Sequence, residues 1–352
     1  MAGITIREVA SEANVSVTTA ADILRGSMKY TYRAETVERV REVAERLGYR
    51  ASAIARMLRR SQTRLVGVGI NVNSMHLSPL VCAVHRALQA RDYEPVLMEL
   101  RARDGWRDGV IFPSPDMLAG ILSIDLQLET NVSDLFSSLG QTLPIVALYP
   151  VQSKEVNCVT ADRAHGVELT VEHLVGLGHR RMAFVSAWPP GFSSVQSKLQ
   201  GWKRALRRFE LDSQSCPAIN LHPHRGSTGI GSLIVAALRE RKPRLTALVC
   251  GDDMTACETI RHLVDEGWSV PQDISIAGYG EHQYAAISVP RLTTIATPNE
   301  RIAAAAVERL IELIEQPDDE VVRQPRHQLF APDLVAREST AAPIVSQTGR
   351  GK

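Results

Sequence analysis

The side chains that could carry out catalysis or bind a metal do not form a recognisable set in this sequence. Gly226, Gly229 and Gly231 have the spacings of a dinucleotide-binding loop in reverse order. His222 and His224 lack a third metal ligand and are more typical of a surface loop. The five cysteines contain no CxxC pair and indicate reduced thiols. We therefore expect no enzyme activity, no cofactor and no metal site.

The chemistry that stands out is electrostatic. Residues 1–60 carry eleven Lys and Arg against seven Asp and Glu, although the whole chain of 352 residues has a net charge of only +1. A basic segment on a neutral body is typical of binding to a polyanion such as DNA. A basic helix surface in water would give the same charge count, so charge alone leaves both interpretations open.

The local sequence predicts three short helices in this basic segment. Thr5 and Glu8 have the spacing of a capping box at the start of the first helix. Ser16 is a good N-cap for a second helix over residues 17–24, and Asn14 and Val15 form the turn before it. A third amphipathic helix is expected over 34–47. Two short helices across a tight turn, covered by a third, describe a helix-turn-helix domain.

From residue 64 onward, short apolar runs alternate with amphipathic helical segments. This alternation predicts an α/β core with parallel sheets covered by helices. We expect two parallel-sheet subdomains with a ligand cleft beyond the carboxyl ends of their strands.

The ordered motifs along the whole chain resemble the LacI/GalR family of bacterial transcriptional regulators. They include ITIREVASEANVSVTTAADILRG at residues 4–26, VTADRAHGVELTVEHLVGLGHRR at 159–181 and TALVCGDDMTACETI at 246–260. The resemblance implies an all-α helix-turn-helix domain joined to a periplasmic-binding-protein-like core. It also implies a repressor on a near-palindromic double-stranded operator, a homodimer formed through the core, and a small effector, with a carbohydrate as the leading class.

The resemblance places the second helix in the major groove of DNA. Val17 and Thr18 match positions that read base edges, and Ser16 and Thr19 match phosphate-contacting or capping positions. Thr5, Asp22 and Arg25 complete the expected DNA-binding face. Asp22 stands where the family usually has arginine. Its carboxylate could accept a hydrogen bond from cytosine N4 or pair with Arg25, and both interpretations remain open.

The segment ASAIARMLRR at residues 51–60 resembles the hinge helix of the family. Leu58 matches the side chain that wedges into the minor groove, and such wedges bend the duplex. Ala55 matches a hinge-packing position, while Arg56 and Arg59 are placed to meet phosphates.

The effector site is expected at four residues that depart from the family pattern. Lys198 replaces an arginine, Asp252 replaces an asparagine, and Gly280 replaces an aspartate that Glu281 follows. A lysine is less selective in geometry than the planar arginine guanidinium. These changes predict a polar pocket without naming its ligand.

The expected organisation has four parts. These are a DNA-binding domain over 1–50, a hinge over 51–63, a core over 64–340 and a disordered tail over 341–352. Within the core, the N-subdomain is expected over about 64–160 and 291–320, and the C-subdomain over about 161–290 and 321–340. The chain has no signal-like amino terminus and no apolar stretch long enough for a membrane span, which favours a cytoplasmic protein. A solute-binding protein without a DNA role is the alternative.

Overall fold

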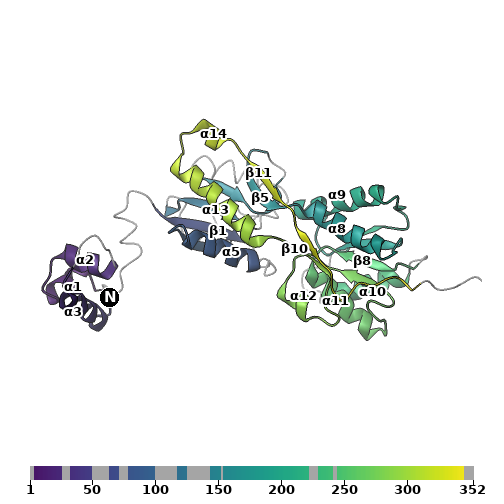
Figure 1. The fold of residues 1–352 in the computed structure, drawn as a ribbon, viewed down its shortest axis with the longest axis horizontal. Coiled ribbons are helices and arrows are strands. Elements are labelled where there is room, and N and C mark those ends of the chain that lie inside the picture. Colours follow the sequence, from purple (N-terminus) through teal and green to yellow (C-terminus); the bar gives the residue numbers. More distant parts are fainter. Residues whose placement is uncertain are drawn as a thin grey trace, which may run out of the picture. The chain divides into compact units, whose positions relative to one another are not determined.

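The fold comes from a computed structural model, which describes residues 4–25, 32–49, 63–70, 78–99, 117–124, 143–151, 154–221, 229–240 and 244–344. The chain forms two compact units, Met1–Arg64 and Leu65–Lys352. Figure 1 shows three short helices in the first unit and helices on sheets in the second. This arrangement confirms the fold class expected from the sequence.

The first unit contains α1 (Ile6–Glu12), α2 (Val17–Arg25) and α3 (Ala34–Arg46). The turn between α1 and α2 passes through Asn14 at a φ of 52°, a left-handed conformation that asparagine tolerates better than most residues. Arg39 of α3 donates from Nε to the Ala13 carbonyl oxygen at 3.1 Å and so ties α3 to this turn. The buried apolar side chains of the three helices form one core, made of Val9, Ala10, Ala13, Ala20, Ile23, Val40, Val43 and Ala44.

The larger sheet of the second unit has six strands in the order β11-β5-β4-β3-β1-β2, and all neighbours are parallel. Its strands are β1 (Leu65–Ile70), β2 (Glu94–Glu99), β3 (Gly120–Ser123), β4 (Ile145–Ala147), β5 (Asn157–Ala161) and β11 (His327–Phe330). The central strands β1, β3, β4 and β5 are almost wholly buried, as expected for a parallel sheet.

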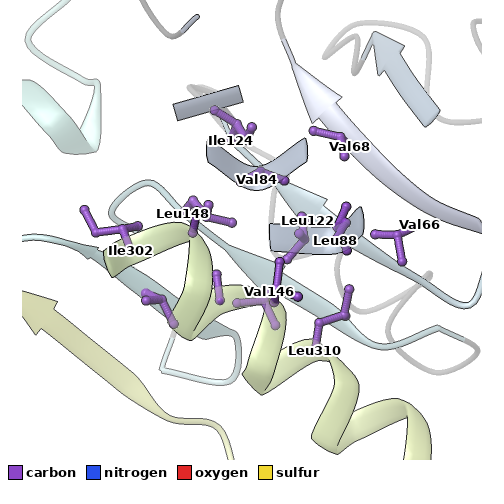
Figure 2. Packing of buried hydrophobic residues seen from close by; sticks show 14 of the residues in the cluster. Val66, Val68, Val84, Leu88, Leu122, Ile124, Val146, Leu148, Ile302 and Leu310 are labelled. Carbon is purple, nitrogen blue, oxygen red and sulfur yellow. The ribbon is translucent and has the colours of Figure 1, made fainter. Parts of the chain in front are cut away.

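Two helices contribute to the apolar core of this sheet, α5 (Ser78–Gln89) and α13 (Asn299–Glu315). Figure 2 shows Val84 and Leu88 of α5 and Leu310 of α13 beside Leu122 and Val146 of the sheet. The ion pair between Arg91, which lies two residues after α5, and Glu308 of α13 has an N–O distance of 3.1 Å, lies at the surface and contributes little to stability.

The smaller sheet has four parallel strands in the order β7-β6-β8-β9. These are β6 (Met182–Ser186), β7 (Ala218–Asn220), β8 (Ala247–Cys250) and β9 (Ser275–Ala277). Two helix pairs pack into two separate cores with this sheet, α8 (Arg163–Gly176) with α9 (Ser193–Arg208), and α10 (Ile230–Arg239) with α11 (Asp253–Asp265). Short helices α12 (Gln283–Ile287) and α14 (Glu320–Arg323) complete the described helices.

A two-stranded antiparallel ribbon of β10 (Thr294–Ala296) and β12 (Asp333–Val335) accompanies the two sheets. The assignment of residues 321–340 to the C-subdomain is wrong for His327–Phe330. This segment pairs with β5 at the edge of the larger sheet, because its backbone groups complete that ladder. Across the described ranges, every helix is too short or too polar to span a bilayer.

Candidate functional site

The start of α2 presents the residues expected to read DNA. Ser16 caps the helix, since its Oγ accepts the Thr19 backbone N–H at 3.0 Å. Ser16, Val17 and Thr18 are exposed, and Val17 keeps 39% of its surface accessible although it is apolar. An exposed valine at a helix N-terminus is suited to apolar contact with a base edge.

The helix before it is fixed by local hydrogen bonds. The Glu8 carboxylate accepts the Thr5 backbone N–H at 2.6 Å and the Thr5 hydroxyl at 2.9 Å. These two donors lower the pKa of Glu8, so the capping carboxylate is charged at neutral pH. The expected helix start at Thr5 is therefore confirmed.

Asp22 has a partner that neither sequence interpretation included. The Tyr32 hydroxyl donates to Asp22 Oδ2 at 3.1 Å, and the Asp22 side chain is half-buried. This bond joins α2 to the residue that lies two positions before α3. The Arg25 side chain, and the hinge residues Ala55, Arg56, Leu58 and Arg59, lie outside the part of the chain that the structure describes.

The second candidate site is a cavity whose lining comes from both sheets of the second unit. Its walls include Leu80 of α5, Tyr149 after β4, Arg163 of α8, Lys198 of α9 and Asp252 before α11. The remaining lining residues are Pro79, Leu148, Ala161, Ser186, Trp188, Ser194, Val195, Gly251, Tyr279, Gly280, His282, Thr297, Asn299 and Ile302. The cavity thus combines aromatic rings, hydroxyl groups and charges.

Lys198, Asp252 and Gly280 line this cavity as expected. The Lys198 ammonium donates to the Gly251 carbonyl oxygen at 2.6 Å and lies 4.4 Å from the centre of the Tyr279 ring. Lys198 keeps some surface open to the cavity, but the protein around its ammonium and the nearby Arg163 lower its pKa to about 8. The carboxylates of Asp252 and Asp253 act in the opposite direction on this pKa.

The Asp252 carboxylate is occupied by protein donors. It caps α11 by accepting the Thr255 backbone N–H at 2.7 Å and the Thr255 hydroxyl at 2.9 Å. The indole N–H of Trp188 donates to the same carboxylate at 3.1 Å. Asp252 therefore positions the Trp188 ring at the cavity wall.

Glu281 does not line the cavity. Its backbone has a φ of 53°, and its carboxylate forms two hydrogen bonds with the guanidinium of Arg337. At Gly280, a Cβ atom would lie 2.3 Å from the ring of His282, which holds the space that a larger side chain would need. His282 is held by the buried Asp253, whose carboxylate accepts from the His282 backbone N–H at 2.8 Å.

Sequence reasoning missed several lining residues, above all Arg163. Helix α8 begins at Arg163 and thereby brings this guanidinium to the cavity. Asp162, the N-cap of α8, accepts the His165 backbone N–H at 3.0 Å and is the local signal for this start. Over the described residues, His, Cys, Asp and Glu form no group of three that could hold a metal ion.

An exposed recognition helix and a polar cavity between two parallel sheets define a ligand-responsive DNA-binding regulator. Residues 5–52 match the family described as "Bacterial regulatory proteins, lacI family", and residues 171–340 match "Periplasmic binding protein-like domain". This chain belongs to the lacI family and is a DNA-binding regulator of transcription.

Two named relatives are similar in sequence to this chain over nearly its whole length. The transcriptional repressor PurR of Vibrio atlanticus is 26% identical over 90% of this chain and 93% of its own. Catabolite control protein A of Priestia megaterium is 28% identical over 92% of this chain and 96% of its own. The first is a transcriptional repressor by name and the second a catabolite control protein.

Solved structures support the fold. The Lac repressor dimer bound to operator and anti-inducer matches with a TM-score of 0.75 at 22% identity, covering 97% of this chain and 100% of that one. A cellobiose complex of the regulator CelR matches with a TM-score of 0.64 at 22% identity, covering 96% of this chain and 99% of that one.

Proposed function

We propose that this chain is a repressor that binds a near-palindromic operator as a homodimer and responds to a carbohydrate-class effector. The observation that carries the proposal is the pairing of an exposed α2 N-terminus with an enclosed polar cavity in the second unit. A single short helix reads few base pairs, and a two-fold dimer doubles the site. The operator-bound Lac repressor dimer and the cellobiose complex support the partner and the effector class.

Within the DNA-binding domain, Val17 and Thr18 contact base edges. Thr5 caps α1 and Ser16 caps α2, and both contact phosphates together with Thr19. Asp22 acts chiefly as a positioning residue, because its carboxylate holds Tyr32. Arg25 and the hinge segment, with Ala55, Arg56, Leu58 and Arg59, contribute phosphate and minor-groove contacts. The hinge occupies residues 51–63, after the three helices of the DNA-binding domain in the chain.

In the core, the effector contacts Lys198 and the backbone at Gly280. Asp252 contributes through Trp188, which it orients. The aromatic rings of Trp188, Tyr149 and Tyr279 supply flat apolar walls, as in most small-molecule sites. Glu281 acts from outside the cavity through its bonds to Arg337.

An electrophoretic mobility-shift assay tests both halves of the proposal. The full-length protein is mixed with the DNA upstream of its own gene, with and without a panel of carbohydrates. We expect specific retardation, loss of it in the double variant Val17→Ala/Thr18→Ala, and release of DNA by a carbohydrate. The matched control is Lys203→Met, an exposed substitution in the other unit that should bind as the wild type does.

Two outcomes would count against the proposal. Equal binding of the wild type and the α2 variant to the upstream DNA would contradict the assignment of the DNA-binding face. A dissociation constant for DNA that no carbohydrate changes would contradict the effector class.

A further inference from the structure

Two cationic side chains from neighbouring helices meet in the effector cavity. Arg163 lies in the first turn of α8 and Lys198 lies in α9. The two helices approach closely at Gly201, where a Cβ atom would lie 2.1 Å from the Ala164 carbonyl oxygen. Arg163 is near enough to Lys198 to contribute to its lowered pKa. The fold therefore holds two like charges together in a partly enclosed space.

The guanidinium of Arg163 is only partly satisfied by the protein. Arg163 is 7% exposed, and its Nη1 donates to the Thr160 hydroxyl at 2.5 Å and to the Ala161 carbonyl oxygen at 3.4 Å. Its planar group stacks on the Tyr149 ring at 4.0 Å. Within the described ranges, Nε and Nη2 have no hydrogen-bond partner and no carboxylate pairs with this arginine. These donors keep access to the cavity, where oxygen atoms of a ligand can accept hydrogen bonds from them.

The cavity offers little negative charge to offset these cations. The Asp252 carboxylate is engaged by Thr255 and Trp188, and Asp253 is fully buried and holds His282. Lys198 donates to a neutral carbonyl oxygen, which leaves further donors on its ammonium. The third acid near the site, Glu281, points to Arg337.

We propose that Arg163 and Lys198 together bind an oxyanion, a carboxylate or a phosphate ester, on a small polyhydroxylated effector. This inference rests on the proposed effector function and narrows its ligand class from neutral carbohydrates to acidic ones. The free edge of a guanidinium matches two oxygen atoms of such a group, and the ammonium adds a point charge. The hydroxyl and aromatic lining then contacts the uncharged part of the ligand.

Isothermal titration calorimetry on the full-length protein tests the proposal with matched probes. Each neutral sugar is compared with its uronate, its aldonate and its 6-phosphate, for example glucose with glucuronate, gluconate and glucose 6-phosphate. We expect at least one acid to bind roughly 30-fold or more tightly than its neutral parent, the loss typical of an unpaired buried charge. Preference for the uronate and aldonate identifies a carboxylate, and preference for the 6-phosphate identifies a phosphate ester.

Variants locate the oxyanion. Arg163→Gln and Lys198→Met should each weaken binding of the acid by roughly 30-fold, a larger loss than either causes for the neutral parent. Arg163→Lys should restore part of the affinity because it keeps the charge without the planar fork. Lys203→Met, an exposed change on α9, should bind as the wild type does. Far-ultraviolet circular dichroism and the thermal midpoint of each variant verify its fold.

The proposal is overturned if no acid binds, if neutral parents bind as tightly as their acids, or if both cavity variants retain wild-type affinity for a bound acid. If neutral sugars bind the protein as tightly as their acids do and cause it to release operator DNA, the proposed function stands and the oxyanion proposal is wrong. If neither acids nor neutral sugars bind in calorimetry or change the mobility shift, both the oxyanion proposal and the proposed effector class are wrong.

Discussion

Replacing Lys198 with methionine removes an enclosed ammonium and keeps an unbranched side chain. Burial first, and Arg163 second, lower the pKa of Lys198 from the ordinary value of 10.5 to about 8. Between these values the unfolded chain binds more protons at this residue than the native protein does, so native stability rises with pH. The methionine variant lacks the contribution of Lys198 to the pH dependence of stability. Wild-type stability should therefore increase relative to the variant as the pH rises above neutrality.

The size of this change follows from linkage. One pH unit of difference in pKa corresponds to about 1.4 kcal/mol. The lowered pKa then gives the wild type at most about 2 kcal/mol over the variant between about pH 7 and about pH 9.5. Arg163, Asp252, Asp253 and the Tyr279 ring surround the side chain at position 198 in both proteins. Loss of the bond to the Gly251 carbonyl shifts the variant by a constant amount and does not change the slope.

Urea unfolding followed by tryptophan fluorescence measures this difference. All four tryptophans, Trp106, Trp188, Trp202 and Trp268, lie in the second unit, so the signal reports on the part that contains Lys198. Lys203→Met, an exposed change on the same helix, should show no such pH dependence. A difference between wild type and Lys198→Met that stays constant with pH, within the extrapolation error, would refute the lowered pKa.

The remaining predictions concern packing and DNA binding. Gly201→Ala places a Cβ 2.1 Å from a backbone oxygen and should lower the free energy of unfolding by about 2 kcal/mol or more. At Gly176 a Cβ meets nothing within 4 Å, so Gly176→Ala should be neutral or stabilising. Equal free energies of unfolding for the two variants would contradict this prediction. Gly280→Asp puts a side chain at a φ of +132° and should destabilise the core by about 1–3 kcal/mol, which thermal unfolding would detect. Operator affinity should fall steeply with salt, by about 0.9 in log–log slope for each neutralised phosphate; a flat plot would exclude the basic face. Asp22→Asn retains an acceptor for Tyr32 and should leave the operator sequence selected from random DNA unchanged; a new base preference at one position would show that Asp22 reads DNA.

The parts of this protein that depend on near neighbours in the chain are readable from its sequence. The capping box at Thr5, the N-cap at Ser16 and the apolar spacing of the first three helices each act over a few residues, and the structure has all of them. The buried strands of the parallel sheets are equally plain, because β1 and β8 begin and end where their apolar runs do. Local free energy decides these elements, so local sequence reveals them.

The cavity is less readable because its residues come together over long distances. Lys198 is recognisable by the family pattern, but Arg163 becomes a lining residue only because the first turn of α8 brings it against Tyr149. Glu281 was expected in the cavity, yet Arg337, which lies 56 residues away in sequence, holds its carboxylate elsewhere. Strand β11 was missed as a sheet member because most of its residues are exposed and show no alternation.

The placement of the two cations bears on how a ligand could act on this fold. Tyr149 follows β4 of the larger sheet and Lys198 lies on a helix of the smaller one, while Arg163 begins α8 after the segment that leads from β5. Ser193 of α9 also donates to the Pro150 carbonyl oxygen at 2.5 Å, which is a direct contact between the two subdomains. A ligand changes a conformational equilibrium only by binding one state more tightly than the other. Arg163 and Lys198 both lie on helices packed on the smaller sheet, so an oxyanion bound to them favours a closed arrangement only through additional contacts with lining residues beside the larger sheet, such as Tyr149.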